Sequence, residues 1–147
     1  MLLDQNPVEE DLKPWNMDLN TYCMLMHLSL FASSIFPIAG IILPLIMWQQ
    51  FKKQSNKIDQ NGKNIMNFIL TTIIAGVAIF VVLIVIFALI LVPEPNGYDL
   101  ISLFFLVIFA LLIIAFGIGY VVLVILAAIK SYNNEIGTYP LTFKFIK

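Results

Sequence analysis

Three long stretches without an acidic residue or a lysine dominate the chain. They comprise 33 residues between Asp18 and Lys52, 30 residues between Lys63 and Glu94, and 30 residues between Asp99 and Lys130. A run of about 18 or more apolar residues is typical of a transmembrane helix. The pattern therefore predicts an all-α integral membrane protein with three transmembrane helices. The expected helices cover residues 21–51, 60–92 and 98–131.

Capping and turn residues set the boundaries of the second and third helices. Asp59 is a good N-cap for the second helix, which places Asn61 in a solvated first turn. If Asn61 and Gly62 form a turn instead, the helix begins near Lys63. The segment PEPNG, residues 93–97, cannot continue a helix. The third helix should end where two asparagines and a glycine follow its last apolar residues.

The first stretch is less regular than the other two because it contains serines and two prolines. Pro37 and Pro44 each remove a backbone donor, and the carbonyl groups left unpaired need serine hydroxyls, water or a neighbouring helix. We interpret residues 21–51 as one transmembrane helix kinked at these two prolines. The alternative is a re-entrant hairpin that turns at residues 37–40, with arms of roughly 22 and 16 Å that are too short to cross.

The C-terminal tail, residues 138–147, is expected to be extended. Its apolar and polar side chains alternate imperfectly, which is strand-like, and Tyr139 followed by Pro140 favours an extended approach. An isolated strand leaves its backbone groups unpaired. We therefore expect the tail to pack against the first loop around residues 57–62, or to pair with a partner protein by strand addition. An aspartate in place of Phe143 should disturb this packing.

Composition leaves little room for a separate soluble domain. The chain of 147 residues is 61% hydrophobic and 12% charged, whereas a soluble domain is about a quarter charged. We expect an acidic N-terminal segment, residues 1–20, followed by a single membrane domain, residues 21–147. The first segment lacks the basic start and apolar centre of a signal peptide. A net charge of −1 argues against binding to nucleic acid.

Lysines indicate the orientation in the membrane. Lys13 is the only lysine before the first predicted helix, four lysines lie around the first loop, and three lie near the C-terminus. The second loop has no lysine. Because cytoplasmic loops carry the excess of lysine and arginine, the three-helix interpretation places the N-terminus outside and the C-terminus in the cytoplasm. The hairpin alternative would place the N-terminus in the cytoplasm.

His27 is the only histidine, and it lies inside an apolar stretch. An ionisable group in a membrane segment suggests a function, but this one lies close to the expected outer interface. The favoured interpretation is a structural hydrogen bond; a proton or pH role and a metal or haem ligand are the alternatives. A metal site needs three or four ligands, so a single histidine would need partners from other subunits. We predict no metal and no cofactor.

The sequence also contains no recognisable catalytic set. There is no serine, histidine and acid combination, no pair of intramembrane carboxylates, no glycine-rich phosphate loop and no cysteine and histidine cluster. Cys23 is the only cysteine and cannot form an intramolecular disulfide. We therefore expect a protein that is not an enzyme.

Ordered landmarks along all three apolar stretches resemble those of a known family. They are His27-Leu28-Ser29, Pro37, Gly40, Pro44, Trp48, Lys53, Asp59, Gly62-Lys63, Asn67-Phe68, Ala127 to Lys130, and the tail TYPLTFKFIK. The set resembles a small bacterial polytopic membrane protein family, mostly of unknown function. That family is similar to the magnetosome MamF proteins and, remotely, to the chloroplast inner-envelope Tic channel subunit. The resemblance implies membrane-embedded scaffolding or complex assembly and a multi-pass place in the bacterial cytoplasmic (inner) membrane.

Two functions follow as hypotheses. The first is a non-catalytic scaffold or accessory subunit of a larger membrane protein complex, linked to protein translocation or assembly. The alternative is a homo-oligomeric pore or a carrier of small solutes or ions. The expected partners are the lipid bilayer and other membrane protein subunits, and a homo-oligomer is compatible with both. The candidate functional or interaction positions are His27, Ser29, Pro37, Gly40, Pro44, Trp48, Lys63, Asn67, Tyr139, Pro140 and Phe143.

Overall fold

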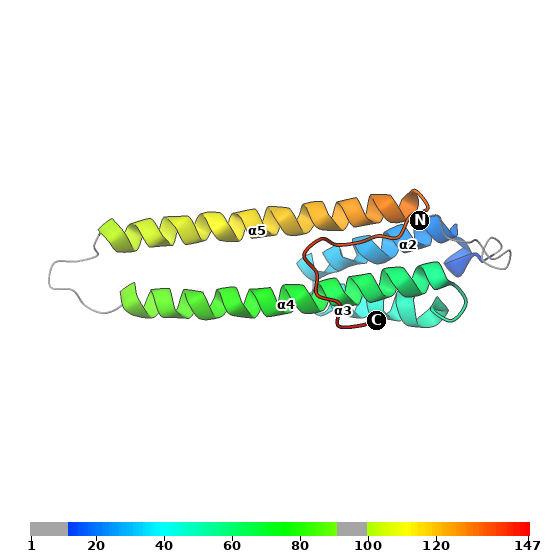
Figure 1. Ribbon diagram of the computed structural model, residues 1–147, viewed down its shortest axis with the longest axis horizontal. Coiled ribbons are helices and arrows are strands. Elements are labelled where there is room, and N and C mark those ends of the chain that lie inside the picture. The colour runs from blue at the N-terminus through cyan, green and yellow to red at the C-terminus, as the bar shows by residue number, and fades with distance from the viewer. Residues whose placement is uncertain (1–11, 91–99) are drawn as a thin grey trace. The chain divides into compact units, whose positions relative to one another are not determined.

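The computed structural model describes residues 12–90 and 100–147, and within these ranges it is helical without any β-strand. Most of the acidic N-terminal segment and the predicted helix end at residues 93–97 lie outside the described residues. The elements, labelled in Figure 1, are η1 (Pro14–Asn16), α2 (Leu19–Leu28), η2 (Ser29–Ser34), α3 (Ala39–Phe51), α4 (Asn56–Ile90) and α5 (Leu100–Tyr132).

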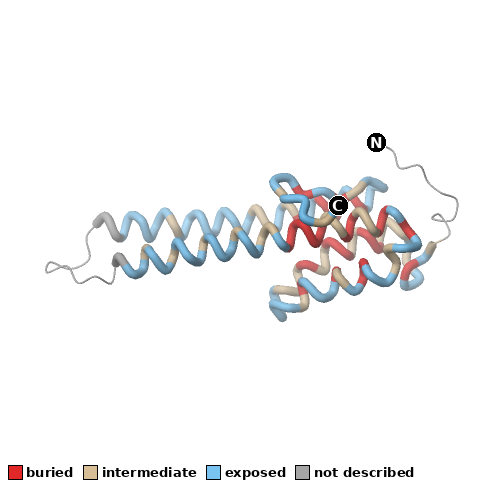
Figure 2. Tube along the Cα trace, turned by 60° about the horizontal axis from the view of Figure 1, so that its bottom comes forward, coloured by how far each residue is buried: buried red, intermediate tan, exposed pale blue. Residues whose placement is uncertain are grey.

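The chain divides into two compact units. The polar unit contains the residues up to Thr71 together with Val122–Lys147, and the apolar unit is Thr72–Val121. Buried residues gather in the polar unit, while the helical segments of the apolar unit are mostly exposed (Figure 2). The described lysines all lie in the polar unit.

The first apolar stretch forms a helical hairpin rather than one kinked helix. The helix α2 begins at Asp18, whose carboxylate accepts the backbone N–H groups of Asn20 and Thr21 at 3.0 and 3.1 Å. It gives way to the tighter η2, the chain turns at residues 35–38, and α3 then returns alongside. The hydroxyl of Tyr22 donates to the carbonyl of Met47 at 2.9 Å across the two arms.

The prediction of a single kinked helix over residues 21–51 is therefore wrong. The chain instead has the helical hairpin shape of the alternative, with its turn slightly earlier than expected. Pro37 lies in the turn, where a residue without a backbone donor ends a helix instead of bending it. Gly40 allows the arms to touch, because a Cβ there would lie 2.7 Å from the Leu30 carbonyl oxygen. Pro44, the second expected kink, is buried within the continuous helix α3.

The helix α4 begins earlier than predicted. The hydroxyl of Ser55 accepts the backbone N–H of Ile58 at 3.3 Å, which makes Ser55 the N-cap in place of Asp59. The carboxylate of Asp59 instead accepts the Trp48 indole N–H at 3.0 Å. Asn61 therefore lies inside the helix and is fully buried, so neither the solvated first turn nor the Asn61-Gly62 turn is present.

The helix α5 ends close to the predicted position. Asn134 adopts a left-handed conformation, with φ of 64°, and the N–H of Glu135 donates back to the Lys130 carbonyl at 3.0 Å. This arrangement is typical of a Schellman helix end. Asparagine tolerates the left-handed region better than most residues, so Asn134 does here what glycine usually does.

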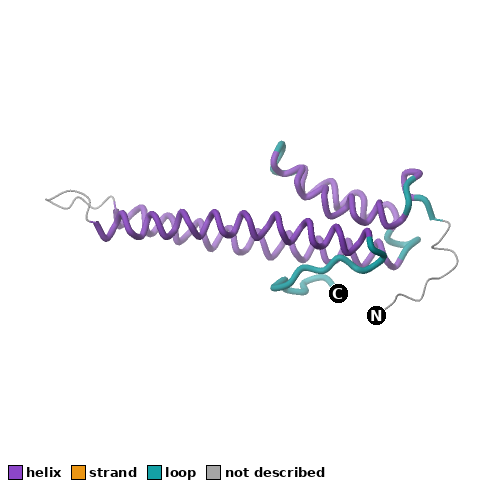
Figure 3. The backbone as a smooth tube through the Cα atoms, turned by 90° about the horizontal axis from the view of Figure 1, so that it is seen from above, coloured by secondary structure: helices purple, strands orange, loops and turns teal. Residues whose placement is uncertain are grey.

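The C-terminal tail is irregular and not a strand, as Figure 3 shows. Its backbone groups bond to side chains of α4 instead of to another strand. The hydroxyl of Thr71 accepts the N–H of Phe143 at 3.2 Å, and the side chain of Asn67 bonds to residues 145 and 146. The strand expectation is therefore wrong. The backbone of the tail bonds to α4 at Asn67 and Thr71, further along than the expected region around residues 57–62, and Gly137, just before the tail, bonds to Asn61.

The apolar unit carries its hydrophobic side chains on the outside. Ile74, Phe80 and Phe104, for example, are 55%, 62% and 62% exposed. Two helices, α4 and α5, are long and apolar enough to span a membrane, and almost none of their most apolar stretches is buried. In water each exposed side chain of this size would cost about 1.5–3 kcal/mol relative to burial, whereas lipid removes that cost.

Candidate functional site

Five residues from four parts of the chain meet in a buried polar cluster, which we call the polar core. Its members are His27 of α2, Asn61 of α4, Ser131 of α5, and Gly137 and Tyr139 of the segment that follows α5. His27, Asn61 and Ser131 are fully buried, and Tyr139 is 7% exposed. A single cluster therefore ties the hairpin, both long helices and the C-terminal segment together.

Asn61 is the centre of this cluster. Its side-chain oxygen accepts from the His27 imidazole at 2.9 Å, from the Ser131 hydroxyl at 2.7 Å and from the Gly137 backbone N–H at 2.9 Å. Its amide nitrogen donates to the Lys57 carbonyl one turn earlier, at 2.8 Å. Three donors thus converge on one oxygen atom inside the protein.

The geometry fixes the protonation of His27. The Gly137 N–H can only donate, so the Asn61 atom that faces it must be the oxygen. That oxygen also faces Nε2 of His27, which must therefore carry a proton. In the neutral ring Nδ1 is then an acceptor, and the Tyr139 hydroxyl donates to it at 2.6 Å.

Burial keeps the imidazole neutral. Loss of hydration lowers the pKa of His27 to about 4, although the hydrogen bond to Asn61 acts in the opposite direction. The ring of Tyr139 stacks on Phe68 with centroids 4.0 Å apart and the planes 8° from parallel, which closes the cluster. His27 makes two internal hydrogen bonds, as the structural interpretation expects.

Gly137 is required by the same packing. A Cβ at this position would lie 2.3 Å from Nε2 of His27 and 2.6 Å from the Ser131 hydroxyl. Both distances are far below a van der Waals contact, and the atoms concerned are fully buried. Only glycine lets the backbone come close enough to bond to Asn61.

A second buried bond network surrounds Lys57, which is 2% exposed. Its ammonium group donates to the side-chain oxygen of Asn20 in α2 and to that of Asn134 after α5, the latter at 3.0 Å. These bonds connect the start of the hairpin to the start of α4 and the end of α5. Lys57 therefore holds together the same parts of the chain as the polar core.

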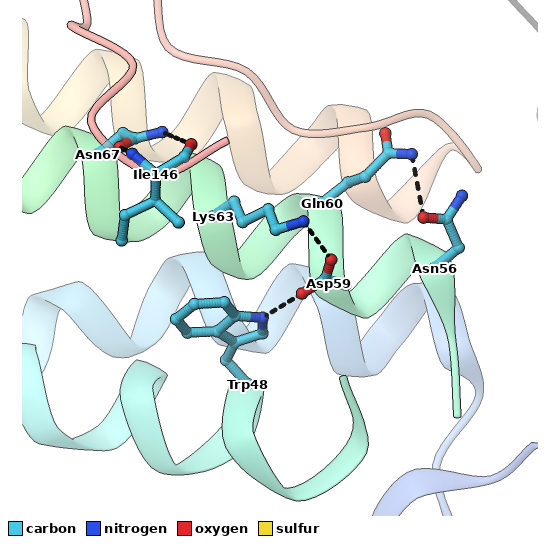
Figure 4. A network of polar contacts seen from close by, with 7 residues as sticks. All are labelled: Trp48, Asn56, Asp59, Gln60, Lys63, Asn67 and Ile146. Atoms are coloured by element: carbon cyan, nitrogen blue, oxygen red, sulfur yellow. Dashed lines mark hydrogen bonds and ion pairs between the residues drawn. The ribbon is translucent and has the colours of Figure 1, made fainter. Parts of the chain in front are cut away.

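Asparagines at a regular spacing bind the C-terminal segment to α4. Asn61, Asn64 and Asn67 are three residues apart, which places them along one side of the helix. Asn64 donates to the Gly137 carbonyl at 2.8 Å. Asn67 accepts from two backbone N–H groups at 2.9 and 2.8 Å and donates to the Ile146 carbonyl at 3.0 Å; Figure 4 shows part of this contact.

The indole of Trp48 joins α3 to α4. It bonds to Asp59, which also forms an ion pair with Lys63 at 2.6 Å, so one carboxylate bridges two side chains (Figure 4). The ring lies against Gly62, where a Cβ would be 2.1 Å from a ring carbon. The ammonium of Lys52 lies 5.0 Å from the centroid of the same ring.

The remaining predicted positions have local roles. The Ser29 hydroxyl bonds to the carbonyl of Met26 at 2.7 Å, within the hairpin. Pro140 is exposed in a turn, and Phe143 is 68% exposed, so its contact with α4 is through its backbone. Sequence reasoning singled out His27 and Tyr139 but missed Asn61, Ser131 and Gly137, the other members of the polar core. It also singled out Asn67, which bonds to the tail.

The polar groups of the site are used for hydrogen bonds within the protein. Among the described residues, every buried polar side-chain atom has a hydrogen-bond partner, and no group of three or more histidine, cysteine or acidic residues could hold a metal ion. The imidazole is neutral and both of its nitrogens are engaged. The polar core therefore stabilises an arrangement of helices around the C-terminal segment.

Comparison with known proteins agrees with the family landmarks identified in the sequence. Residues 18–146 match the MamF/MmsF family, described as the magnetosome magnetite crystal formation protein family. No curated protein and no solved structure matches the chain. The match covers the hairpin, both long helices and the C-terminal segment, and it confirms the resemblance to MamF, while the remoter resemblance to the Tic channel subunit stays a prediction. The chain therefore belongs to the magnetosome magnetite crystal formation protein family.

Proposed function

We propose that this chain is a non-catalytic integral membrane scaffold, an accessory subunit that organises partner proteins at the cytoplasmic face of a bacterial membrane. The observation that carries the proposal is the polar core, whose hydrogen-bonding groups are used to hold the chain's own segments together. Family membership supports a place in a membrane, since the family's description concerns crystal formation in magnetosomes. From these two observations together we infer that the chain organises a membrane surface.

The hairpin supports two crossings rather than three. Its two ends lie together, because Tyr22 bonds to Met47 and Trp15 bonds to Gln50 at 2.9 Å. The N-terminal side and the first loop are then on the same side of the membrane. With α4 and α5 crossing, all eight lysines fall on one side and none in the second loop, which favours a cytoplasmic N-terminus and C-terminus.

The hairpin also fits a segment that dips into one leaflet. Its first arm, α2, runs in the same direction as the start of α4, since Asn20 bonds to Lys57 and His27 bonds to Asn61 further along both helices. The tip residues Ile35 and Phe36 are 77% and 69% exposed. The arms, α2 with η2 and α3, are roughly 27 and 20 Å long, which is shorter than a core of about 30 Å.

A pore is a weaker second candidate. The segments 73–88 and 103–119 contain only apolar residues and glycine. A water-filled path needs polar side chains or exposed backbone along its wall. The homo-oligomeric pore or carrier therefore has less support than the scaffold.

The proposed orientation predicts a labelling pattern. In a Cys23→Ser background, single cysteines at Asn6, Asn96 and Glu135 would be treated with an impermeant thiol reagent on intact spheroplasts. Only the cysteine at position 96 should react, and the other two should react after permeabilisation. Labelling at position 6 in intact spheroplasts would restore the topology with an external N-terminus.

The scaffold role predicts a stable partner. Extraction in a mild detergent, followed by affinity purification, should yield the chain with at least one other membrane protein in fixed proportion. Phe143→Asp should release this partner without unfolding the chain, because Phe143 is largely exposed and bonds to α4 only through its backbone. Thr71→Val, which removes the acceptor of that bond, serves as the comparison. Purification of the chain alone, or as a homo-oligomer that conducts ions in vesicles, would contradict the scaffold.

A further inference from the structure

A polar cavity of about 300 Å³ lies between α4 and the segment that follows α5. Its lining includes Gln60 and Asn64 from α4, and Thr138, Tyr139, Thr142 and Lys144 from the C-terminal segment. All of these residues belong to the polar unit. The volume is at the small end of the range for ligand pockets, roughly 300–1,000 Å³, so it suits a small polar group.

The lining offers donors that the described part of the chain does not use. Among the residues that the structure describes, the side chains of Thr138, Thr142 and Lys144 form no hydrogen bond or ion pair. Lys144 is the only charged residue of the lining, which contains no carboxylate. Two hydroxyls and one ammonium group are donors of the kind that bind a phosphate.

Along α4, the end of the cavity at Asn67 lies at the depth of lipid head groups. On α4 the exposed apolar side chains begin at Leu70; Asn67 precedes that point by about 5 Å and Gln60 by about 15 Å along the helix axis. The polar interface of a bilayer extends roughly 5–8 Å beyond each side of the hydrocarbon. Phe143 and Phe145, on either side of Lys144, are 68% and 50% exposed, as expected of side chains that enter an interface.

We propose that this cavity binds a phosphate ester, and that in the cell the ester is the head group of an anionic glycerophospholipid. Lys144 supplies the charge, and the hydroxyls of Thr138 and Thr142 donate to the phosphate oxygens. The site would couple the C-terminal segment to the lipid composition of the cytoplasmic leaflet. The lipid assignment rests on the membrane embedding proposed above, while the donor set of the cavity does not depend on it.

The test uses the full chain in detergent and a matched pair of variants, Lys144→Gln and Lys147→Gln. Each removes one positive charge from the same segment, but Lys147 does not line the cavity. Native mass spectrometry would measure binding of dioctanoyl phosphatidylglycerol, dioctanoyl phosphatidylcholine and glycerol 3-phosphate. Phosphatidylglycerol should bind best, Lys144→Gln should weaken it about tenfold, as expected for a lost charge-assisted bond, and Lys147→Gln less than twofold. Thr142→Val should weaken it to a lesser extent than Lys144→Gln.

Three outcomes would overturn the proposal in different ways. Equal weakening by both lysine variants would show diffuse surface charge, and equal binding of phosphatidylcholine would show no anionic site. Glycerol 3-phosphate binding as tightly as the lipid would retain the phosphate site but overturn its assignment to lipid. Resistance of each variant to alkaline extraction from membranes would be measured in parallel, so a failure of membrane embedding is distinguished from a failure of the cavity to bind.

Discussion

Replacing Asn61 with leucine should lower the free energy of unfolding of the polar unit by about 3–5 kcal/mol. Leucine is similar in size but offers no acceptor. The imidazole of His27, the hydroxyl of Ser131 and the N–H of Gly137 would all lose the oxygen on which they converge. Each buried donor without a partner costs about 1–3 kcal/mol, and the three lie in one buried site. Tryptophan fluorescence during denaturant unfolding in detergent would measure the change.

Asn64→Leu is the matched control for this change. Asn64 lies one turn further along α4, is only partly buried, and donates a single bond to the Gly137 carbonyl. Its replacement should cost about 1 kcal/mol. If the two leucine variants were equally stable, Asn61 would not be the centre of the cluster. Ser131→Ala, which removes one of the three donors, should fall between wild type and Asn61→Leu.

Acid should destabilise the polar unit through His27. Burial lowers the pKa of His27 from 6.5 to about 4 in the folded chain. Below pH 6.5 the unfolded chain therefore takes up a proton that the folded chain does not bind. The contribution of His27 is fully present above pH 6.5 and is lost progressively as the pH falls to about 4, by about 3 kcal/mol in all. Unfolding free energies measured between pH 7.5 and 4 would show this loss.

His27→Gln separates this effect from the titration of the carboxylates. Glutamine can donate and accept hydrogen bonds but does not titrate in this range. The variant should be less stable than wild type at pH 7.5, because an amide cannot reproduce both bonds of the imidazole. Between pH 6.5 and 4 its stability should change much less than that of wild type. An unchanged acid dependence would mean that His27 is not the group responsible.

The long helices are the part of the fold that the sequence predicts best. Their apolar runs are long and uniform, and one local property, hydrophobicity over about 30 residues, is enough to identify them. The start of α4 is hard to place from the sequence because Ser55 and Asp59, four residues apart, both make good N-caps. The bond between Asp59 and Trp48 decides between them, and it joins residues 11 apart on different helices.

The hairpin was harder to predict because its local pattern is ambiguous. Prolines and serines in an apolar segment are compatible with a kink and with a turn alike. What selects the turn is contact between the arms, such as Tyr22 with Met47 and Gly40 with the Leu30 carbonyl. Each of these contacts joins residues on two different arms, so a short stretch of sequence does not contain both partners.

The sequence indicates only some of the residues of the polar core. His27 and Tyr139 stand out because of their chemistry, whereas Asn61 looked like an ordinary residue of a helix start. The signal that could have found it is the spacing of Asn61, Asn64 and Asn67, which places three amides on one side of a helix. The alternation of the C-terminal segment suggested a strand, but those amides pair with its backbone and a second strand is not needed.

The distance in sequence across the polar core has a consequence for biosynthesis. His27 and Tyr139 are 112 residues apart, so during translation the hairpin leaves the ribosome long before the segment that completes its core. Until then, the imidazole lacks the partner on its Nδ1 nitrogen, and Phe68 lacks the ring that stacks on it. A ribosome that stops before residue 137 would leave the hairpin open and exposed to quality-control proteases. The polar core can therefore form only after the chain has been synthesised through Tyr139.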